Sequence, residues 1–121
     1  MSYIDGMIVA VPRASKSDYI EFAHKMNALF LEYGATRLVD AWGEDVPHGK
    51  QTDFHRAVAA TEDETVVFSW IEWPDKATRD AAWGKIMEDP RMKSAEKPPY
   101  EGSRLIYGGF EALIDIRGDA K

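Results

Sequence analysis

Two segments of the chain are apolar on both of the alternating faces that a β-strand presents. In Tyr3–Val11, the two faces carry Met7, Val9 and Val11, and Ile4, Ile8 and Ala10. The segment Thr65–Trp73 reads Thr-Val-Val-Phe-Ser-Trp-Ile-Glu-Trp and is also largely apolar on both faces. Because a strand with two apolar faces is covered on both sides, we predict that both segments are central strands of one sheet.

Two further segments alternate less cleanly and carry more polar residues. Thr36–Glu44 mixes apolar and charged side chains on both faces, which is typical of an edge strand. Ser103–Ile116 is a last extended segment, and we expect its Gly108-Gly109 pair to mark a bulge or a bend.

Helical periodicity separates these strands. After Ser15, apolar residues recur at steps of three and four, which predicts an amphipathic helix ending near Gly34, with its stripe formed by Tyr19, Phe22, Ala23, Met26, Leu29, Phe30 and Tyr33. Ser15 and Asp18 resemble a capping box at its start. A second helix is expected to open at Pro74-Asp75 and end before Pro90, where Asp89-Pro90 starts a further short turn.

The resulting order is β-α-β, a long link over residues 45–64, and β-α-β. Within the link, Thr52 is expected to cap a short helix. This order predicts an α+β fold with a single ferredoxin-like domain over residues 1–121. Its four-stranded antiparallel sheet has the order 4-1-3-2 and carries two helices on one face. Since the central strands are apolar on both faces, the uncovered face needs a partner, and we expect a homodimer.

Composition narrows the possible functions. The 121 residues include 15 Lys and Arg against 21 Asp and Glu, giving a net charge of −6, and no cysteine. The acidic balance argues against nucleic-acid binding, and the absence of cysteine removes thiol chemistry. No apolar run approaches the length of a membrane span, and no signal pattern is evident, so we expect a cytoplasmic protein with no membrane partner.

Three motifs carry a resemblance to a known family. They are Tyr3-Ile4-Asp5-Gly6, Val66–Pro74 with the sequence Val-Val-Phe-Ser-Trp-Ile-Glu-Trp-Pro, and Ile106–Glu111 with the sequence Ile-Tyr-Gly-Gly-Phe-Glu. They resemble the YbaA-like bacterial proteins, a domain-of-unknown-function family within the dimeric α/β-barrel superfamily. The resemblance implies a ferredoxin-like protomer and a dimer whose two sheets face each other. It implies no activity and no catalytic residues, and relatives in the superfamily range from monooxygenases to ligand-binding regulators.

A small-molecule pocket is expected where the second strand, the third strand and the 45–64 link meet. The link is long enough to form a lid, and it holds two of the three histidines, which suit proton transfer near neutral pH. The neighbouring strands add tryptophans and a carboxylate, the mixture that small-molecule sites use. The candidate ligand-binding residues are Asp40, Trp42, His48, His55, Trp70 and Arg104.

Several alternatives stay open at this level. The tryptophans can serve core and dimer packing alone, which leaves a non-catalytic structural or regulatory dimer. Arg104 and Glu72 could form an ion pair. No cofactor and no metal is assigned, although His48 and His55 could bind a hard cation or zinc together with Asp40, Glu44, Asp45 and Asp53. Whether the protein is an enzyme does not follow from the sequence.

Overall fold

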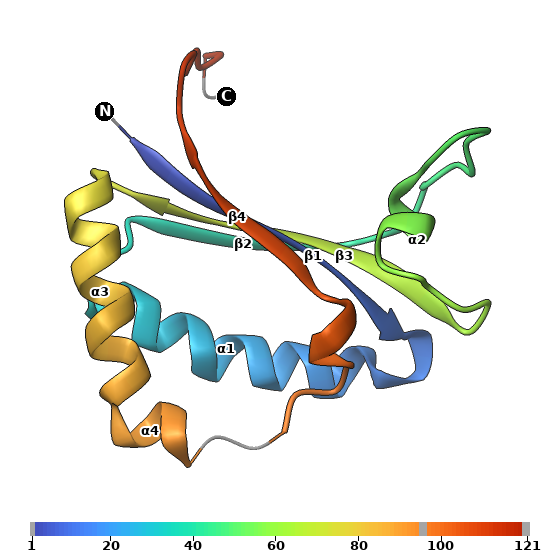
Figure 1. Cartoon of the computed structure of the whole chain (residues 1–121), viewed down its shortest axis with the longest axis horizontal. Helices are drawn as coiled ribbons and strands as arrows, with labels where there is room; N and C mark the ends of the chain where they lie inside the picture. Colours follow the sequence, from blue (N-terminus) through green and yellow to red (C-terminus); the bar gives the residue numbers. More distant parts are fainter. Residues whose placement is uncertain (1, 95–96, 120–121) are drawn as a thin grey trace.

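The computed structural model describes residues 2–94 and 97–119. The elements in chain order are β1 (Tyr3–Pro12), η1 (Arg13–Ser15), α1 (Lys16–Glu32), β2 (Arg37–Trp42), α2 (Phe54–Ala57), β3 (Glu64–Trp73), α3 (Lys76–Glu88), α4 (Pro90–Lys93), η2 (Gly102–Arg104) and β4 (Ile106–Glu111). The sheet has four strands, and Figure 1 shows the helices labelled α1 and α3 on one side of it.

The sheet confirms the predicted ferredoxin-like topology. Its strand order is β2-β3-β1-β4, and all three pairings are antiparallel. The two central strands are β1 and β3, the segments that are apolar on both faces, and they pair along their whole length from Tyr3 opposite Trp73 to Pro12 opposite Glu64. The fold class and strand order are therefore as the sequence predicts.

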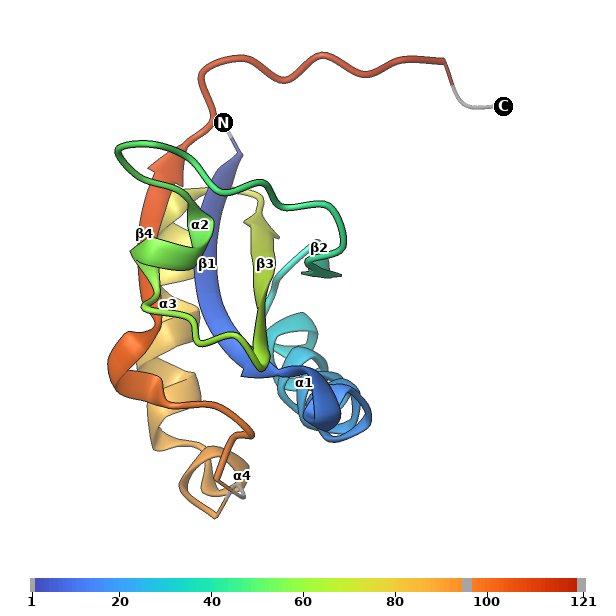
Figure 2. The ribbon, with the colours of Figure 1, turned by 90° about the vertical axis from the view of Figure 1, so that its right-hand side faces the viewer.

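Alternation along β1 and β3 creates two distinct faces. The helix face packs against α1 and α3, and its buried core includes Val9, Val11, Val67, Ile71 and Trp73. The opposite face, here called the open face, has no long helix over it (Figure 2). One end of the open face is covered by the link between β2 and β3, because Val58 packs there on Ala10 and Val66.

Local details differ from the sequence predictions in four places. Helix α1 does follow Ser15, but a 3₁₀ turn precedes it and the Ser15 side chain makes no capping hydrogen bond, so no capping box forms. The short helix α2 is capped by Asp53 rather than Thr52, because the Asp53 carboxylate accepts the backbone N–H of Arg56 at 2.7 Å. The edge strand β2 is shorter than expected, at Arg37–Trp42.

The fourth difference concerns the last strand. β4 spans only Ile106–Glu111, and its register with β1 is unbroken through Gly108 and Gly109, so the expected bulge is absent from this strand. Of the two glycines, only Gly109 is needed for space. A Cβ on Gly109 would lie against the Tyr3 hydroxyl and 2.9 Å from Nη2 of Arg79.

Two helix ends follow the sequence closely. Gly34 follows α1 with φ 117°, a left-handed conformation that glycine adopts without strain, and the Ala35 N–H returns to the carbonyl of Phe30 at 2.9 Å. Asp89 caps α4, whose first residue is Pro90, and accepts the Arg91 backbone N–H at 2.8 Å.

Candidate functional site

The six residues predicted to line one pocket are divided among three places. Asp40 and Trp42 of β2 lie on the helix face, beside Tyr19 of α1. Trp70 of β3 lies on the open face, where its ring packs on Phe68 at 5.8 Å. Since β2 pairs with β3 through Val39 opposite Trp70, the two tryptophans point to opposite faces of the sheet.

The other three residues lie in or beside the link. His48 and His55 stack on each other, with ring centroids 4.2 Å apart. Arg104 of η2 forms a bidentate ion pair with Glu64, at 2.7 Å for both contacts, and not with Glu72, the partner that the sequence suggested. The structure therefore brings the histidines together and brings Asp40 and Trp42 together, while Trp70 packs on Phe68 and Arg104 pairs with Glu64.

A cavity lies between the helix face of the sheet and helices α1 and α3. Its volume is about 610 Å³, within the range of small-molecule sites. Of the six predicted residues, its lining includes only Asp40. Most of the wall is apolar, from the side chains of Met7, Val9, Phe22, Ala23, Met26, Phe30, Trp83, Met87, Met92, Tyr100, Leu105 and Tyr107.

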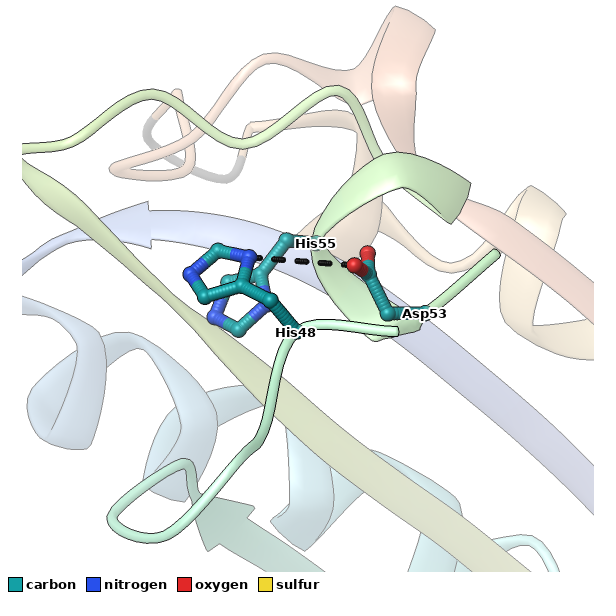
Figure 3. Close-up of side chains that lie close together, drawn as sticks. All are labelled: His48, Asp53 and His55. Atoms are coloured by element: carbon teal, nitrogen blue, oxygen red, sulfur yellow. Dashed lines mark ion pairs between the residues drawn. The ribbon is translucent and has the colours of Figure 1, made fainter. Parts of the chain in front are cut away.

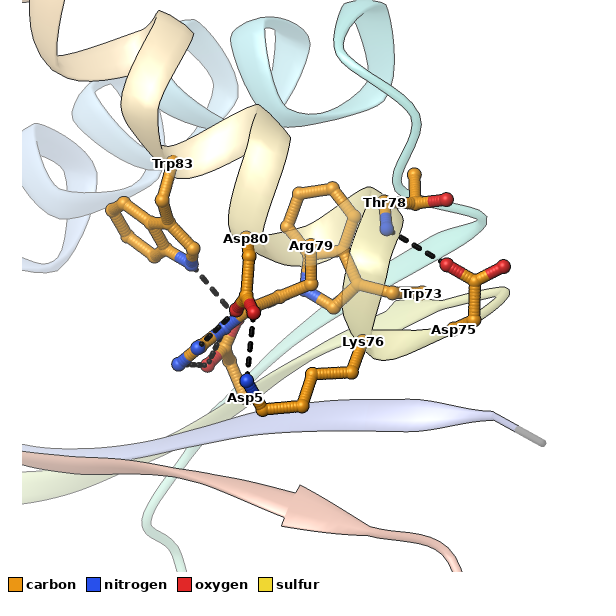
Figure 4. A network of polar contacts seen from close by, with 8 residues as sticks. All are labelled: Asp5, Trp73, Asp75, Lys76, Thr78, Arg79, Asp80 and Trp83. Carbon is orange, nitrogen blue, oxygen red and sulfur yellow. Dashed lines mark hydrogen bonds and ion pairs between the residues drawn. The ribbon is translucent and has the colours of Figure 1, made fainter.

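Asp5 forms the centre of a polar network at one end of this cavity (Figure 4). The residue is only 4% exposed. Its carboxylate accepts hydrogen bonds from Arg79, at 2.7 Å from Nη2 and at 3.1 and 3.2 Å from Nε, and from the indole N–H groups of Trp73 and Trp83 at 2.9 and 3.0 Å. The Asp5 contact raises the pKa of Arg79 above its ordinary value, so Arg79 stays charged.

Asp40 anchors a second polar group at another part of the cavity. The Tyr19 hydroxyl donates to Oδ1 at 2.6 Å, and the Asn27 amide donates to Oδ2 at 2.9 Å. Burial, followed by the hydrogen bond to Asp40, raises the pKa of Tyr19 far above its usual range. Burial, followed by the negative charge of Asp40, also raises the pKa of Tyr100. Both phenols are therefore neutral hydrogen-bond donors at physiological pH.

Ser69 lies between these two polar groups on the floor of the cavity. It is buried on β3, opposite Met7 of β1 and Asp40 of β2. Its side chain belongs to the lining of the cavity, so its hydroxyl is a further polar group that a bound molecule could contact.

The list of candidate residues from the sequence omits Asp5, Arg79, Ser69 and Trp83. A signal for Asp5 was present, since period-two alternation places it on the same face as Met7 and Val9, where a lone carboxylate must be paired. Its partners lie more than 60 residues away in the sequence. Only the tertiary arrangement brings them together.

The histidine pair has a third neighbour (Figure 3). Nδ1 of His48 lies 3.7 Å from Oδ2 of Asp53, whose side chain is 4% exposed. Backbone hydrogen bonds from Arg56 and Gly49 lower the pKa of Asp53. Potential ligand atoms of His48, Asp53 and His55 all lie within 4.8 Å of one another. Asp40, Glu44 and Asp45, which the sequence allowed as further ligands, are not members of this group.

The sheet order, the single helical layer and the cavity beneath it define a ferredoxin-like α+β protein. The sequence matches the family described as "Protein of unknown function (DUF1428)" over residues 2–102. Because this match spans most of the chain, the chain belongs to the DUF1428 family.

Relatives and a solved structure agree with this assignment. The chain is 57% identical over 116 residues to the uncharacterized protein YbaA of Escherichia coli (strain K12), covering 95% of this chain and 99% of YbaA. The YbaA of Shigella flexneri matches with the same identity and coverage. A crystal structure of a dimeric ferredoxin-like protein from an uncultured marine organism superposes with a TM-score of 0.58 at 9% identity, covering 95% of this chain and 98% of that one. At that identity, the likeness supports the fold alone.

No helix in the part of the chain that the structure describes is long and apolar enough to cross a membrane.

Proposed function

We propose that this protein binds a small organic molecule in the cavity between its sheet and helices α1 and α3. The observation that carries the proposal is a cavity of about 610 Å³ with a largely apolar wall and a few polar groups directed into it. Methionines line it at Met7, Met26, Met87 and Met92, and their flexible side chains can adapt to a ligand's shape. This replaces the link as the expected location of the pocket.

The charges of the lining indicate the class of ligand. The lining contains one guanidinium, that of Arg79, and three carboxylates, those of Asp5, Asp40 and Asp80. Arg79 is already bonded to Asp5 and Asp80, and the hydrogen bonds to Asp40 come from the neutral groups of Tyr19 and Asn27. The cavity therefore disfavours anions, and its ligand is a neutral or cationic, mostly apolar molecule.

A fluorescent probe tests this proposal directly. Nile red, which is neutral and apolar, is expected to bind the full chain saturably with one site per chain. Ala23 of α1 lines the cavity, so Ala23→Phe fills it and is expected to weaken binding at least tenfold. Ala81→Phe, at an exposed position of α3, is the matched control and leaves binding unchanged. Equal binding by both variants would show that the probe binds elsewhere and would contradict the proposal.

The charge argument has its own test. The anionic probe 1-anilinonaphthalene-8-sulfonate is expected to bind more weakly than Nile red. If the anion binds more tightly than Nile red and Ala23→Phe abolishes that binding, the cavity is the binding site but the proposed ligand class is wrong.

The assembly proposed for this function is a homodimer formed through the open face. Exposed apolar side chains on that face include Phe68 at 43%, Ile106 at 43% and Phe110 at 59%, and Phe54 of α2 borders them at 43%. Single exposed hydrophobic residues are normal on a protein surface, but several of them on one face indicate an interaction surface. Pairing two copies through the same face gives a closed two-fold contact, and the marine ferredoxin-like protein described above is dimeric by its description.

A dimer without a ligand is the second candidate. It is favoured by the Asp5 network, whose members already satisfy one another. A chain that forms dimers but binds neither probe in the cavity would support this candidate.

A further inference from the structure

The link between β2 and β3 contains a cluster of side chains that takes no part in the cavity. His48 precedes α2, Asp53 caps it, and His55 lies within it. Their potential ligand atoms lie within 4.8 Å of one another. Two imidazoles and one carboxylate form a donor set that borderline-soft divalent metals accept.

Asp53 is held in place independently of the histidines. Oδ1 accepts the Arg56 N–H at 2.7 Å, and Oδ2 accepts the Gly49 N–H at 3.0 Å. The guanidinium of Arg56 also donates to the carbonyl of Lys50 at 3.0 Å. These contacts close the loop from Gly49 to Arg56 on itself, so the carboxylate is positioned before any ligand arrives.

His55 presents a nitrogen that lacks a partner. Its Nδ1 is buried and has no hydrogen-bond partner among the described residues. Buried polar atoms without partners are uncommon in folded proteins, and each one calls for an explanation such as a bound ion or water. His48, stacked on His55 with an interplanar angle of 18°, keeps 77% of its side chain exposed, which leaves it space to rotate.

We propose that His48, Asp53 and His55 form a binding site for one divalent transition-metal ion of the zinc class. Metal–ligand bonds of about 2.0–2.1 Å in a tetrahedral site place donor atoms about 3.4 Å apart. The observed separations do not exceed 4.8 Å, and the exposed His48 side chain has space to rotate toward the other two donors. Three protein donors leave a fourth position for water.

An ion bound there would connect the loop at His48 to helix α2. This helix lies against the open face, where the Phe54 ring packs on Phe68 at 6.1 Å. The site is therefore on the opposite side of the sheet from the cavity. Metal binding at this site can be tested independently of ligand binding in that cavity.

The test uses the untagged full-length chain after treatment with a chelator. Titration with Zn²⁺ by calorimetry, and with Co²⁺ by visible absorption, is expected to show one ion per chain. His48→Ala is expected to weaken binding at least about tenfold, the lower end of what loss of even an outer-shell partner costs. Circular dichroism checks that this exposed position leaves the fold intact. The remaining histidine of the chain, His24, is exposed on α1. His24→Ala is therefore the matched control and leaves binding unchanged.

A second measurement requires no substitution. In imidazole NMR spectra of the wild-type chain, Zn²⁺ is expected to shift the His48 and His55 signals together and leave His24 unmoved. The absence of any heat or absorption at a large excess of ion would overturn the proposal. So would equal binding by His48→Ala and the wild type, or a metal-induced shift confined to His24.

Discussion

The two faces of the sheet differ in how completely their polar side chains are paired. On the helix face, Asp5 is buried among Arg79, Trp73 and Trp83 and receives hydrogen bonds from all three. On the open face, the Arg37–Glu72 pair is looser, at 3.6 Å, and the Arg37 side chain is 64% exposed. The helix face therefore completes its polar contacts within one chain.

Apolar groups show the reverse contrast. On the helix face of β3, Trp73 and Ile71 are each 1% exposed, whereas Phe68 and Phe110 on the open face are 43% and 59% exposed. Because burying apolar surface is the main favourable contribution to folding and association, the helix face stabilises the single chain. The open face retains driving force for contact with a second copy.

The largest effect is expected from breaking the buried network of the helix face. Asp5→Ala leaves the Arg79 charge and two indole N–H groups without their acceptor, and we expect a loss of about 3–5 kcal/mol in the free energy of unfolding. Urea denaturation followed by circular dichroism measures it. Asp80→Ala removes a 46% exposed partner of the same arginine and should cost about 1 kcal/mol or less. Similar losses for both variants would contradict the assigned importance of Asp5.

The open face gives the next largest effect, on assembly rather than folding. Phe68→Asp places a charge at the centre of the proposed dimer contact in both copies. If each substituted copy loses about 2 kcal/mol, the dimer weakens roughly a thousandfold. Light scattering and analytical ultracentrifugation measure the change. Ile20→Asp on α1, where the native side chain is 47% exposed, is the control and leaves the oligomeric state unchanged. A wild-type chain that is monomeric at micromolar concentration would refute the dimer itself.

The elements that form these two faces could largely be predicted from the sequence. The two-faced apolar pattern of Tyr3–Val11 and Thr65–Trp73 identifies the central strands, because strand periodicity is a local property. The helical stripe from Tyr19 to Tyr33 identifies α1 for the same reason. The strand order then follows from topological rules that few arrangements satisfy.

The candidate site was less accessible to sequence reasoning because it depends on register. Whether Trp42 and Trp70 share a face is decided by the pairing of β2 with β3, and a shift of one residue reverses the answer. The cavity depends on where α3 crosses the sheet, which places Arg79 and Trp83 over Asp5. The histidine cluster, by contrast, is local to eight residues, and the sequence already offers its histidines as possible metal ligands although their spacing matches no known metal motif.

The ion pair between Glu64 and Arg104 is expected to make a pH-dependent contribution to the free energy of unfolding. The hydrogen bonds from Arg104 lower the pKa of Glu64 from 4.5 to about 2. A carboxylate with a depressed pKa in the folded state stabilises the fold above its ordinary pKa, so this stabilisation is lost as the pH falls from 4.5 toward 2. We expect about 1–2 kcal/mol, because Arg104 keeps 20% of its side chain exposed and water screens the pair.

Urea denaturation between pH 7 and pH 2 checks this expectation. Glu64→Gln should lower the stability at neutral pH and flatten the pH dependence. Glu101→Gln removes the other, 69% exposed partner of Arg104 and should leave the profile close to that of the wild type. A Glu64→Gln profile parallel to the wild-type profile would show that this carboxylate does not titrate with folding.

The smallest expected effect compares the two faces at neighbouring residues of β4. A Cβ on Gly109, on the helix face, would press against the Tyr3 hydroxyl and lie 2.9 Å from Nη2 of Arg79, the atom that donates to Asp5. A Cβ on Gly108, on the open face, would meet only the Phe110 ring at 3.4 Å, an ordinary contact. Neither glycine has a positive φ, so alanine fits the backbone at both positions.

Gly109→Ala is therefore expected to destabilise the chain by about 1 kcal/mol, because Arg79 must shift away from Asp5 to make room. Gly108→Ala is expected to be neutral or to stabilise by up to about 0.5 kcal/mol, because alanine restricts the unfolded chain more than glycine does. Urea denaturation of the two variants, measured at a protein concentration that keeps the assembly state constant, gives the difference. Equal effects would mean that Tyr3 and Arg79 move without cost, and the helix face would then be no more rigid than the open face beside it.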